Sequence, residues 1–339
     1  MSQTILITGG GTGGHLSVAK SFIDEFYARG YEVIFIGSTK GQDKKWFENY
    51  PLLSHTYFMN TKGVVNQNFL GKIVSLFMIL QAVISSTKII KKHNISKVIS
   101  VGGFSAAAAS FAAIITRTDF YIHEQNSVMG RLNTITSKFA KEIFSSYLES
   151  SKVKDYPIAQ NFFEHQRVRS EVKTVIFLGG SQGATAINEF ALKVAPKLTQ
   201  MRISIIHQTG KNDFEKIKKK YEELEIDVDV FDFSKQLLEK MDKADFAVSR
   251  AGASTLWELV ALGIPTFFIP FPYAAANHQY FNAKYLLDNH LCFLQTQEKL
   301  DENYFFECLG DNIEFKSEKL LNTIHRDAVK NIVDIIIEQ

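Results

Sequence analysis

The chain has 339 residues, of which 45% are hydrophobic and 22% are charged, which is typical of a globular protein. The formal net charge of +2 gives no argument for a nucleic-acid partner. The two cysteines, Cys292 and Cys308, lack the spacing of a metal site and favour a reducing compartment.

Strands and helices are expected to alternate along both halves of the chain, which predicts parallel sheets with helices on both faces. In the first half the patterns predict strands near 4–8, 33–36, 98–101, 120–122 and 143–146, and helices near 15–28, 40–49, 72–93, 104–116 and 128–139. In the second half they predict strands near 174–178, 203–207, 228–231, 246–248 and 266–269, and helices near 183–197, 211–223, 235–241, 254–262 and 276–289. A polar linker at 147–172 separates the halves. The chain length and this alternation of strands and helices in both halves indicate an α/β protein of two domains.

A glycine-rich turn follows the first strand of each half. Gly-Gly-Gly-Thr-Gly-Gly-His occupies 9–15, and Gly-Gly-Ser-Gln-Gly occupies 179–183. Glycine lets backbone N–H groups approach an anion, and the following helix presents its positive end to that anion. The pair predicts two similar domains that face a shared ligand cleft. Tight strand-to-helix turns without a ligand are the plainer explanation for either motif alone.

The first turn does not fit a dinucleotide-binding fingerprint. Such a fold needs an acid at the end of the second strand to hold ribose, and here Gly37, Ser38 and Thr39 stand there. His15 starts the next helix and is a candidate base near neutral pH. The alternative for His15 is a helix-start residue that bonds to the backbone.

Two further strand ends in the first half carry polar groups. Ser105 follows Gly102 and Gly103 and is expected to cap the next helix. His-Glu-Gln-Asn at 123–126 places four polar side chains at the end of an apolar strand. If they are buried they need hydrogen-bond partners, which a sugar, a phosphate or an internal network would supply.

In the second half, small residues at 251–253 follow a strand and open a helix, whose free N–H groups suit a diphosphate. Glu258, one turn further on, is placed to accept both hydroxyls of a ribose. The alternative is a capping box formed by Thr255 and Glu258. Asn277, His278 and Gln279 open another helix, where side chains can bind sugar hydroxyls.

The segment 69–84 is apolar nearly all round but is short for a membrane span. It predicts either a core helix or a partly exposed face that rests on a membrane. In the second case Lys88, Lys91 and Lys92 would lie near anionic headgroups.

Six motifs together resemble the MurG family of bacterial glycosyltransferases, which add N-acetylglucosamine to lipid I to make lipid II of peptidoglycan. The resemblance covers roughly residues 4–335. The motifs occur in family order at 10–15, 102–105, 123–126, 179–183, 249–255 and 278–283.

The resemblance implies a GT-B fold, two Rossmann-like domains with a cleft between them. Residues 1–155 would form the domain for the lipid acceptor and the membrane, and 156–320 the domain that binds UDP-N-acetylglucosamine. Residues 321–339 would form a helix that packs back on the first domain. Such an enzyme would be peripheral to the cytoplasmic face of the inner membrane, and other cell-wall synthesis proteins remain open as partners.

The resemblance also assigns roles to single residues. Thr12, Gly13 and Gly14 would line the cleft, next to His15, which stays the candidate base. The donor would be bound by Asn126 and Gln279 at the sugar, Ser181 at the diphosphate, Ala253, Ser254 and Thr255 through helix-start N–H groups, Glu258 at the ribose, and Ser234 at the uracil through its backbone.

The chain departs from the family at several points, which include the stretch 103–108 and a loop before His278 that is one residue longer. Val18 stands where the family has proline, and the hinge arginine that reaches the donor has no clear copy. The nearest match to the hinge motif, at 156–159, has no arginine, and Arg167 and Arg169 are two candidates to substitute for it, neither of which the sequence favours.

The implied reaction is an inverting glycosyl transfer that needs neither metal nor other cofactor, with closure of the two domains excluding water. Two alternatives remain at this point. A GT-B-fold UDP-N-acetylglucosamine epimerase would convert the nucleotide sugar without an acceptor, and a non-catalytic sugar-nucleotide-binding subunit would bind the donor without transfer.

Overall fold

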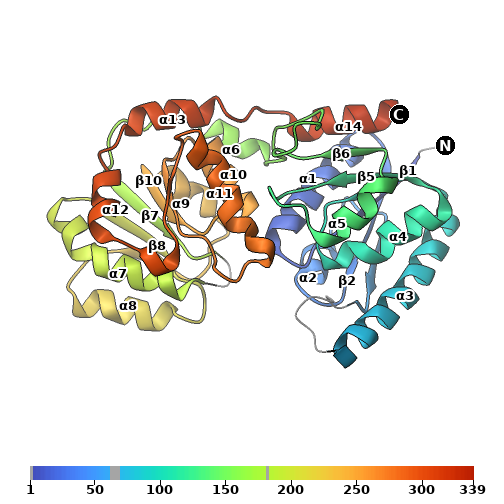
Figure 1. Cartoon of the computed structure of the whole chain (residues 1–339), viewed down its shortest axis with the longest axis horizontal. Coiled ribbons are helices and arrows are strands. Elements are labelled where there is room, and N and C mark those ends of the chain that lie inside the picture. The colour runs from blue at the N-terminus through green and yellow to red at the C-terminus, as the bar shows by residue number, and fades with distance from the viewer. Residues whose placement is uncertain (1–2, 62–68, 181–182) are drawn as a thin grey trace. The chain divides into compact units, whose positions relative to one another are not determined.

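The computed structural model describes residues 3–61, 69–180 and 183–339, with side chains described from residue 74 on in the helix that starts at Phe69. It divides into two units (Figure 1). Unit 1 comprises residues 1–158 and 327–339, and unit 2 comprises 159–326. The divisions therefore fall a few residues after the predicted boundaries at 155/156 and 320/321.

Unit 1 is built on a six-stranded parallel sheet in the order β3-β2-β1-β4-β5-β6. Its strands are β1 (Thr4–Thr8), β2 (Glu32–Ser38), β3 (His55–Met59), β4 (Ile95–Ser100), β5 (Asp119–His123) and β6 (Glu142–Phe144). Its helices are α1 (Gly13–Ala28), α2 (Asp43–Phe47), α3 (Phe69–Lys92), α4 (Ala107–Thr116), α5 (Arg131–Thr136) and α14 (Ala328–Glu338), with 3-10 turns at Phe104–Ala106 and Ser137–Phe139.

The two faces of this sheet are covered by different helices. On one face, Val83 and Ile90 of α3 and Ala112 of α4 join the strand residues Leu6 and Ile34 in one buried cluster. On the other face lies α1, and the chain's last helix, α14, packs against it (Figure 1). The apolar side of α14 is buried, and its polar side is tied to α1 because the Arg29 guanidinium donates hydrogen bonds to Asp334 and to the Lys330 carbonyl.

Unit 2 repeats the plan with a second parallel sheet, in the order β12-β11-β10-β7-β8-β9. Its strands are β7 (Thr174–Leu178), β8 (Ser204–Gln208), β9 (Asp229–Phe231), β10 (Phe246–Ser249), β11 (Thr266–Phe268) and β12 (Phe293–Leu294). Its helices are α6 (Gln160–Glu164), α7 (Thr185–Gln200), α8 (Phe214–Glu223), α9 (Leu237–Asp242), α10 (Ala253–Ala261), α11 (His278–Asp288), α12 (Glu302–Cys308) and α13 (Ile313–Leu321).

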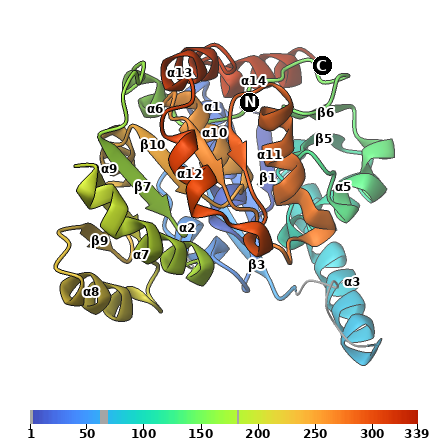
Figure 2. The same cartoon turned by 60° about the vertical axis from the view of Figure 1, so that its left-hand side comes forward.

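The core of unit 2 lies between this sheet and the helices α7 and α12 (Figure 2). Phe305 of α12 makes ring contacts with Phe177, Phe190 and Phe267, which come from β7, α7 and β11. Such aromatic contacts bury much apolar area, so they fix how the helices sit on the strands. Within each sheet the strands are all parallel, so their carboxyl ends, which the predicted site residues follow, lie on one edge of that sheet.

The predicted α/β fold with two Rossmann-like domains is confirmed. Two strands were not predicted, β3 and β12. The predicted helix 128–139 is shorter, because α5 ends at Thr136. Ser105 does not cap α4, since that helix starts at Ala107 and no side chain caps it.

Candidate functional site

The glycine turn after β1 interlocks with the turn after β4. Gly9 and Gly11 have φ of +125° and +88°, and Gly103 has φ of +80°, a region that favours glycine. A Cβ on Gly103 would lie 2.2 Å from the Gly10 carbonyl oxygen, and a Cβ on Gly9 would lie 2.5 Å from that of Gly102. The two turns therefore approach as closely as glycine permits, which explains why both strand ends carry glycine pairs.

A buried carboxylate that the sequence analysis missed supports the first glycine turn. Asp43 starts α2 and is fully buried. Its Oδ1 accepts a hydrogen bond from the Gly11 N–H at 2.5 Å, and its Oδ2 accepts one from the Ser38 N–H at 2.8 Å. An acid does therefore follow β2, but both of its oxygens are bound by the protein's own backbone. This use of Asp43 agrees with the argument against a dinucleotide-binding fingerprint.

His15 lies in the first turn of α1 and is partly exposed. Its Nδ1 is 2.9 Å from the Thr12 hydroxyl oxygen. Burial, and secondarily the neighbouring His15, lower the pKa of His123 to about 3, so the His123 ring below is neutral at physiological pH. When Nδ1–H of His15 donates to Thr12, the basic lone pair lies on Nε2, which is the form that a general base requires.

The His-Glu-Gln-Asn motif at the end of β5 forms an internal network. Glu124 is buried and accepts hydrogen bonds from the N–H groups of Asn126 and Gly130, at 2.9 and 3.0 Å, and from the Asn133 amide at 2.7 Å. Gln125 also binds within the protein, through a backbone carbonyl and a tyrosine hydroxyl. Of the two explanations for this motif, the internal network therefore holds for Glu124 and Gln125. Glu124 fixes the backbone position of Asn126.

In unit 2 the glycine turn after β7 contains Gly180 and Gly183, with φ of +73° and +81°. A Cβ on Gly183 would lie 2.7 Å from the Thr209 carbonyl oxygen, so this turn packs tightly on the loop after β8. Ser181, predicted to bind the diphosphate, lies outside the described residues.

The turn after β10 leads directly into α10, which begins at Ala253 with Gly252 as its N-cap. No side chain caps this helix, and Thr255 already lies within it, so the capping-box explanation of Thr255 and Glu258 is wrong. The N–H groups of Ala253, Ser254 and Thr255 belong to the first turn of α10, at the positive end of the helix. Burial raises the pKa of Glu258, one turn further on, to about 7.

Loops on either side of α10 are held by specific bonds. Arg250 donates to the carbonyls of Ile269 and Pro270, each at 3.0 Å, and so ties the loop after β11 to that after β10. The side-chain carbonyl oxygen of Gln279 accepts a hydrogen bond from the Phe271 N–H at 3.0 Å, so this oxygen is already bound within the protein. Ser234 lies after β9, where its hydroxyl accepts from a backbone N–H two residues on.

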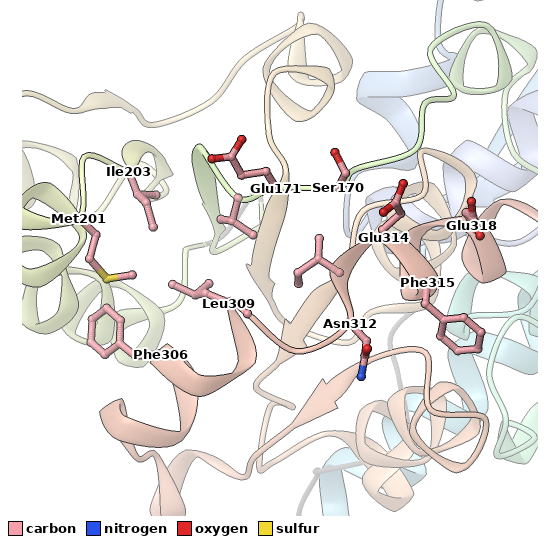
Figure 3. A pocket seen from close by; sticks show the side chains of 13 residues that line it. Ser170, Glu171, Met201, Ile203, Phe306, Leu309, Asn312, Glu314, Phe315 and Glu318 are labelled. Atoms are coloured by element: carbon pink, nitrogen blue, oxygen red, sulfur yellow. The ribbon is translucent and has the colours of Figure 1, made fainter.

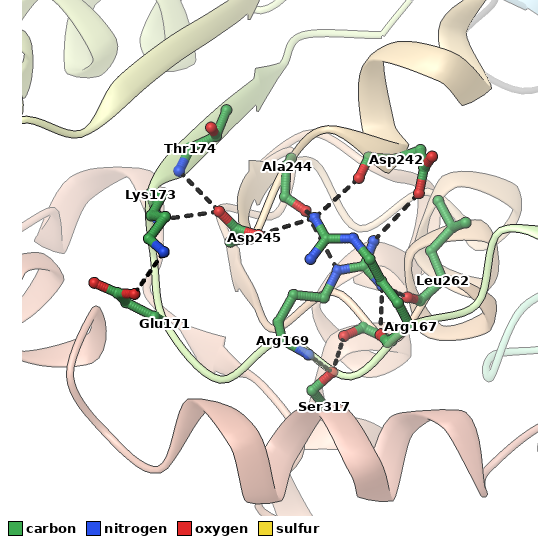
Figure 4. A network of polar contacts seen from close by, with 11 residues as sticks. Arg167, Arg169, Glu171, Lys173, Thr174, Asp242, Ala244, Asp245, Leu262 and Ser317 are labelled. Carbon is green, nitrogen blue, oxygen red and sulfur yellow. Dashed lines mark hydrogen bonds and ion pairs between the residues drawn. The ribbon is translucent and has the colours of Figure 1, made fainter.

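Arg167 and Arg169 do not replace the missing hinge arginine. Arg169 is buried and donates to the carbonyls of Arg167, Ala244 and Leu262 (Figure 4). Arg167 bonds to the carboxylate of Asp245, which directly precedes β10. Burial, and next the Arg167 charge, lower the pKa of Arg169 to about 9. Both side chains are thus committed to the amino ends of the strands, opposite the edge that carries the glycine turns.

Two other features of unit 2 also lie at its amino edge. A hollow of about 910 Å³ is lined by residues that precede β7 and β8 and by α13, and Glu171, Glu314 and Glu318 give it an acidic border (Figure 3). A border of this sign repels a diphosphate. The Asp-x-Asp pair of Asp227 and Asp229 lies at the start of β9, where Asp229 pairs with Lys240. Neither feature therefore belongs to a sugar-nucleotide site at the carboxyl edge.

Helix α3 has one buried and one exposed apolar face. Val83, Ile89 and Ile90 are buried. The other face exposes 52–64% of the area of five large apolar side chains, Val74, Leu76, Phe77, Leu80 and Ile84. We call these five residues the α3 apolar face. By length and composition Val74–Lys92 could cross a membrane, with a mean hydropathy of 1.5 and a third of its most apolar window buried. The sequence allowed either a core helix or a partly exposed one. The core-helix explanation fits the buried face of α3 but not the α3 apolar face, which is exposed.

The chain is similar to known proteins along its whole length. Residues 5–145 match the glycosyltransferase family 28 N-terminal domain, and residues 174–336 match the family 28 C-terminal domain. Two relatives are named UDP-N-acetylglucosamine--N-acetylmuramyl-(pentapeptide) pyrophosphoryl-undecaprenol N-acetylglucosamine transferase. That of Sulfurovum sp. is 47% identical over 334 residues and 98% of each chain, and that of Campylobacter jejuni subsp. doylei is 50% identical over 338 residues, 99% of this chain and 97% of the relative.

Solved structures show the same fold. The crystal structure of Acinetobacter baumannii MurG matches with a TM-score of 0.80 and 25% identity over the full length of both chains. The UDP-GlcNAc 2-epimerase from Neisseria meningitidis matches over the full length with a TM-score of 0.65 and 14% identity, and this likeness shows the fold alone.

Proposed function

Because this chain belongs to the glycosyltransferase family 28, we propose that it transfers N-acetylglucosamine from UDP-N-acetylglucosamine to the lipid-linked N-acetylmuramyl-pentapeptide, lipid I, and so forms lipid II. The observation that carries this function is the near-full-length identity of about 50% with transferases of that name. The epimerase alternative is supported only by a shared fold.

We propose that unit 1 binds the acceptor and that His15 removes the proton from the attacking hydroxyl. The hydroxyl oxygen forms a bond to the anomeric carbon while the bond from that carbon to the diphosphate oxygen breaks, and UDP leaves. Thr12, Gly13 and Gly14 adjoin His15 in sequence, so they would position the acceptor sugar. Asn126, whose backbone Glu124 fixes, would contact a sugar as well.

Unit 2 would bind the donor. The first-turn N–H groups of α10, at Ala253 to Thr255, suit the diphosphate, since fixed dipoles stabilise the charge that develops on a leaving group. Glu258 would accept the ribose hydroxyls, and Gln279 would donate its amide N–H to the sugar. The loop that carries Ser234 would present backbone groups to the uracil.

The transfer would need no metal, because these N–H dipoles do what a metal does in other enzymes. The position of Asp227 and Asp229 at the amino end of β9 supports this, since a metal held there would not reach a diphosphate at the carboxyl edge. The absence of a cofactor is likewise a proposal for this chain.

The decisive experiment is transfer of labelled N-acetylglucosamine from its UDP donor to a lipid I analogue, with and without EDTA. We expect labelled lipid product in both conditions. Conversion of the donor without acceptor would instead support the epimerase, and donor binding without any product would support a binding subunit. Product that disappears in EDTA and returns with Mg²⁺ would contradict metal independence while leaving the transferase function intact.

Donor affinity is expected to rise about tenfold between pH 6 and pH 8. The reason is that ribose hydroxyls donate to the ionised carboxylate of Glu258, whose pKa of about 7 leaves it mostly protonated at pH 6 and mostly ionised at pH 8. Calorimetric titration with UDP-N-acetylglucosamine across this range measures the effect. Glu258→Gln should bind more weakly and show no such slope, whereas Glu222→Gln, at an exposed position of α8, should behave as wild type. An unchanged slope in Glu258→Gln would remove Glu258 from the ribose site.

We further propose that the α3 apolar face rests on the cytoplasmic surface of the membrane, where the acceptor is anchored. Its apolar side chains would enter the interface, and the exposed Lys88, Lys91 and Lys92 at the end of the helix would favour anionic headgroups. This surface would make the protein peripheral to the membrane and bring unit 1 to its substrate. Other proteins of cell-wall synthesis that act at the membrane would meet it there.

The double substitution Phe77→Glu with Leu80→Glu should weaken binding to anionic liposomes at least about tenfold, because each apolar side chain contributes about 1 kcal/mol or more when buried. Co-sedimentation with vesicles measures the bound fraction. Leu224→Glu, at an exposed apolar position of unit 2, is the matched control and should bind as wild type. Equal binding of all three proteins would place the membrane contact elsewhere.

A further inference from the structure

A cluster of metal-binding side chains lies at the amino edge of the unit 1 sheet, opposite the glycine turns. Glu32 starts β2, His55 starts β3, and His93 follows the last residue of α3. One potential ligand atom from each residue lies within 4.8 Å of the other two. Three separate elements thus bring two imidazoles and a carboxylate together, although 61 positions of sequence separate Glu32 from His93.

The contacts within the cluster arrange it for a cation. Nδ1 of His55 is 4.0 Å from Oε1 of Glu32, while the other oxygen, Oε2, accepts a hydrogen bond from the Thr4 hydroxyl at 3.2 Å. Thr4 therefore holds the carboxylate with one oxygen directed toward His55. The rings of His55 and His93 have centroids 4.6 Å apart at an angle of 55°. Two protonated rings at this separation would repel each other, whereas two neutral rings can share one positive ion.

Tyr57 supplies an outer partner of the kind that metal-binding histidines use. Its hydroxyl lies 2.8 Å from Nε2 of His93. When that nitrogen donates its proton to the hydroxyl oxygen, the lone pair of the ring lies on Nδ1, where it can bind a cation. Ligating histidines usually donate their second N–H to such a partner, which fixes the ring and makes the ligand nitrogen more basic.

The donor set identifies the class of metal. Two imidazole nitrogens and one carboxylate oxygen suit Zn²⁺ and its neighbours in the first transition row, whereas Mg²⁺ and Ca²⁺ prefer oxygen ligands alone. Tetrahedral Zn²⁺ with bonds of about 2.0–2.1 Å separates its ligand atoms by about 3.3 Å. The ligand atoms here must therefore approach by about an ångström. About half of the His55 side chain and 39% of that of Glu32 are exposed, so both can make that movement.

We propose that Glu32, His55 and His93 form a binding site for one Zn²⁺-class cation, with water at the fourth position. The bound ion would cross-link the starts of β2 and β3 to the carboxyl end of α3. Because α3 carries the α3 apolar face, the ion would fix the carboxyl-terminal end of the helix that presents this face. The site is separate from the transfer chemistry, since it lies at the opposite edge of the same sheet.

Calorimetric titration of the untagged, full-length protein with Zn²⁺ tests the site. We expect one ion per chain for the wild type, and binding at least about 100-fold weaker for His55→Ala and for His93→Ala, because a ligand contributes more than an outer partner. Tyr57→Phe keeps all three ligands and should lose about 10-fold. His290→Asn, which removes an exposed histidine of unit 2, is the matched control and should bind as wild type. Asparagine tolerates the positive φ of that position.

One spectroscopic and one thermal measurement test metal binding without any measurement of enzyme activity. Co²⁺ in place of Zn²⁺ should give the visible absorption of a low-coordinate nitrogen and oxygen site, and it should vanish in His93→Ala. Zn²⁺ at about 100 times its dissociation constant should raise the melting temperature of the wild type by about 5 °C or more, but not that of Glu32→Gln. Variants that melt as wild type without metal establish that they fold. Equal Zn²⁺ affinity of the wild type and His55→Ala, or no binding by the wild type, would overturn the proposal.

Discussion

Replacing His15 by alanine is expected to lower the turnover of glycosyl transfer about 10²–10⁴-fold, the usual contribution of a general base. His15 lies in the first turn of α1, next to the glycine turn, and Thr12 contacts its Nδ1 at 2.9 Å. The neutral His123 below it, with a pKa lowered to about 3, adds no positive charge that would weaken His15 as a base. The substitution also leaves unit 2 unchanged, so donor affinity should stay at its wild-type value.

Initial rates at saturating donor and lipid I analogue measure this effect. Thr12→Val removes the hydrogen-bond partner of Nδ1, so its turnover should fall between those of wild type and His15→Ala, with a shifted pH profile, because the ring loses the contact that orients it. His290→Asn serves as the control for loss of a histidine elsewhere. If His15→Ala retained near-normal turnover, another group would have to take the proton.

Asp43→Ala is expected to lower the free energy of unfolding of unit 1 by about 2–6 kcal/mol. The carboxylate is buried and receives the N–H groups of Gly11 and Ser38, and each buried N–H left without a partner costs about 1–3 kcal/mol. Turnover should fall as well, since the glycine turn that Asp43 holds leads directly into His15. Asp43 would act as a positioning residue, because it touches the turn rather than the substrate.

Urea unfolding followed by tryptophan fluorescence in a Trp257→Phe background, where Trp46 of α2 is the remaining tryptophan, measures the loss. Asp43→Asn keeps only one acceptor oxygen and should lie between wild type and alanine. The matched control is Glu48→Ala, at an exposed carboxylate of the same segment that pairs with Lys44, and it should cost less than about 1 kcal/mol. A loss for Asp43→Ala no larger than that of Glu48→Ala would show that the turn holds its shape without this carboxylate.

The general fold follows from the sequence because buried parallel strands form continuous apolar runs, and the first strand of each half leads into a glycine turn. Of the twelve strands that the described residues form, the two that were missed have other patterns. Strand β3, with the sequence His-Thr-Tyr-Phe-Met, is partly exposed at the edge of its sheet, and β12 has two residues. Edge strands need fewer apolar residues, so their sequences resemble those of loops. Missing β3 also concealed the cluster of Glu32, His55 and His93.

Single side-chain contacts were harder to predict, because they depend on where an element begins and on contacts distant in sequence. Thr255 and Glu258 have capping-box spacing, yet α10 starts two residues before Thr255. In the sequence, Asp43 has the pattern of an ordinary acid in the first turn of a helix. Its bond to the Gly11 N–H is evident only in the folded structure. Arg169 follows the polar linker like a free hinge residue, but its bonds reach Ala244 and Leu262, more than 70 positions away.

The return of α14 to unit 1 has a consequence for how the protein is made. Unit 1 is discontinuous: its last segment, 327–339, leaves the ribosome only after all of 159–326 has been synthesised. Until then the surface of α1 that α14 covers stays open to water, and unit 2 is complete before unit 1 is. The nascent chain thus carries an uncovered apolar surface until residues 327–339 emerge, and this is the interval in which a chaperone would protect it.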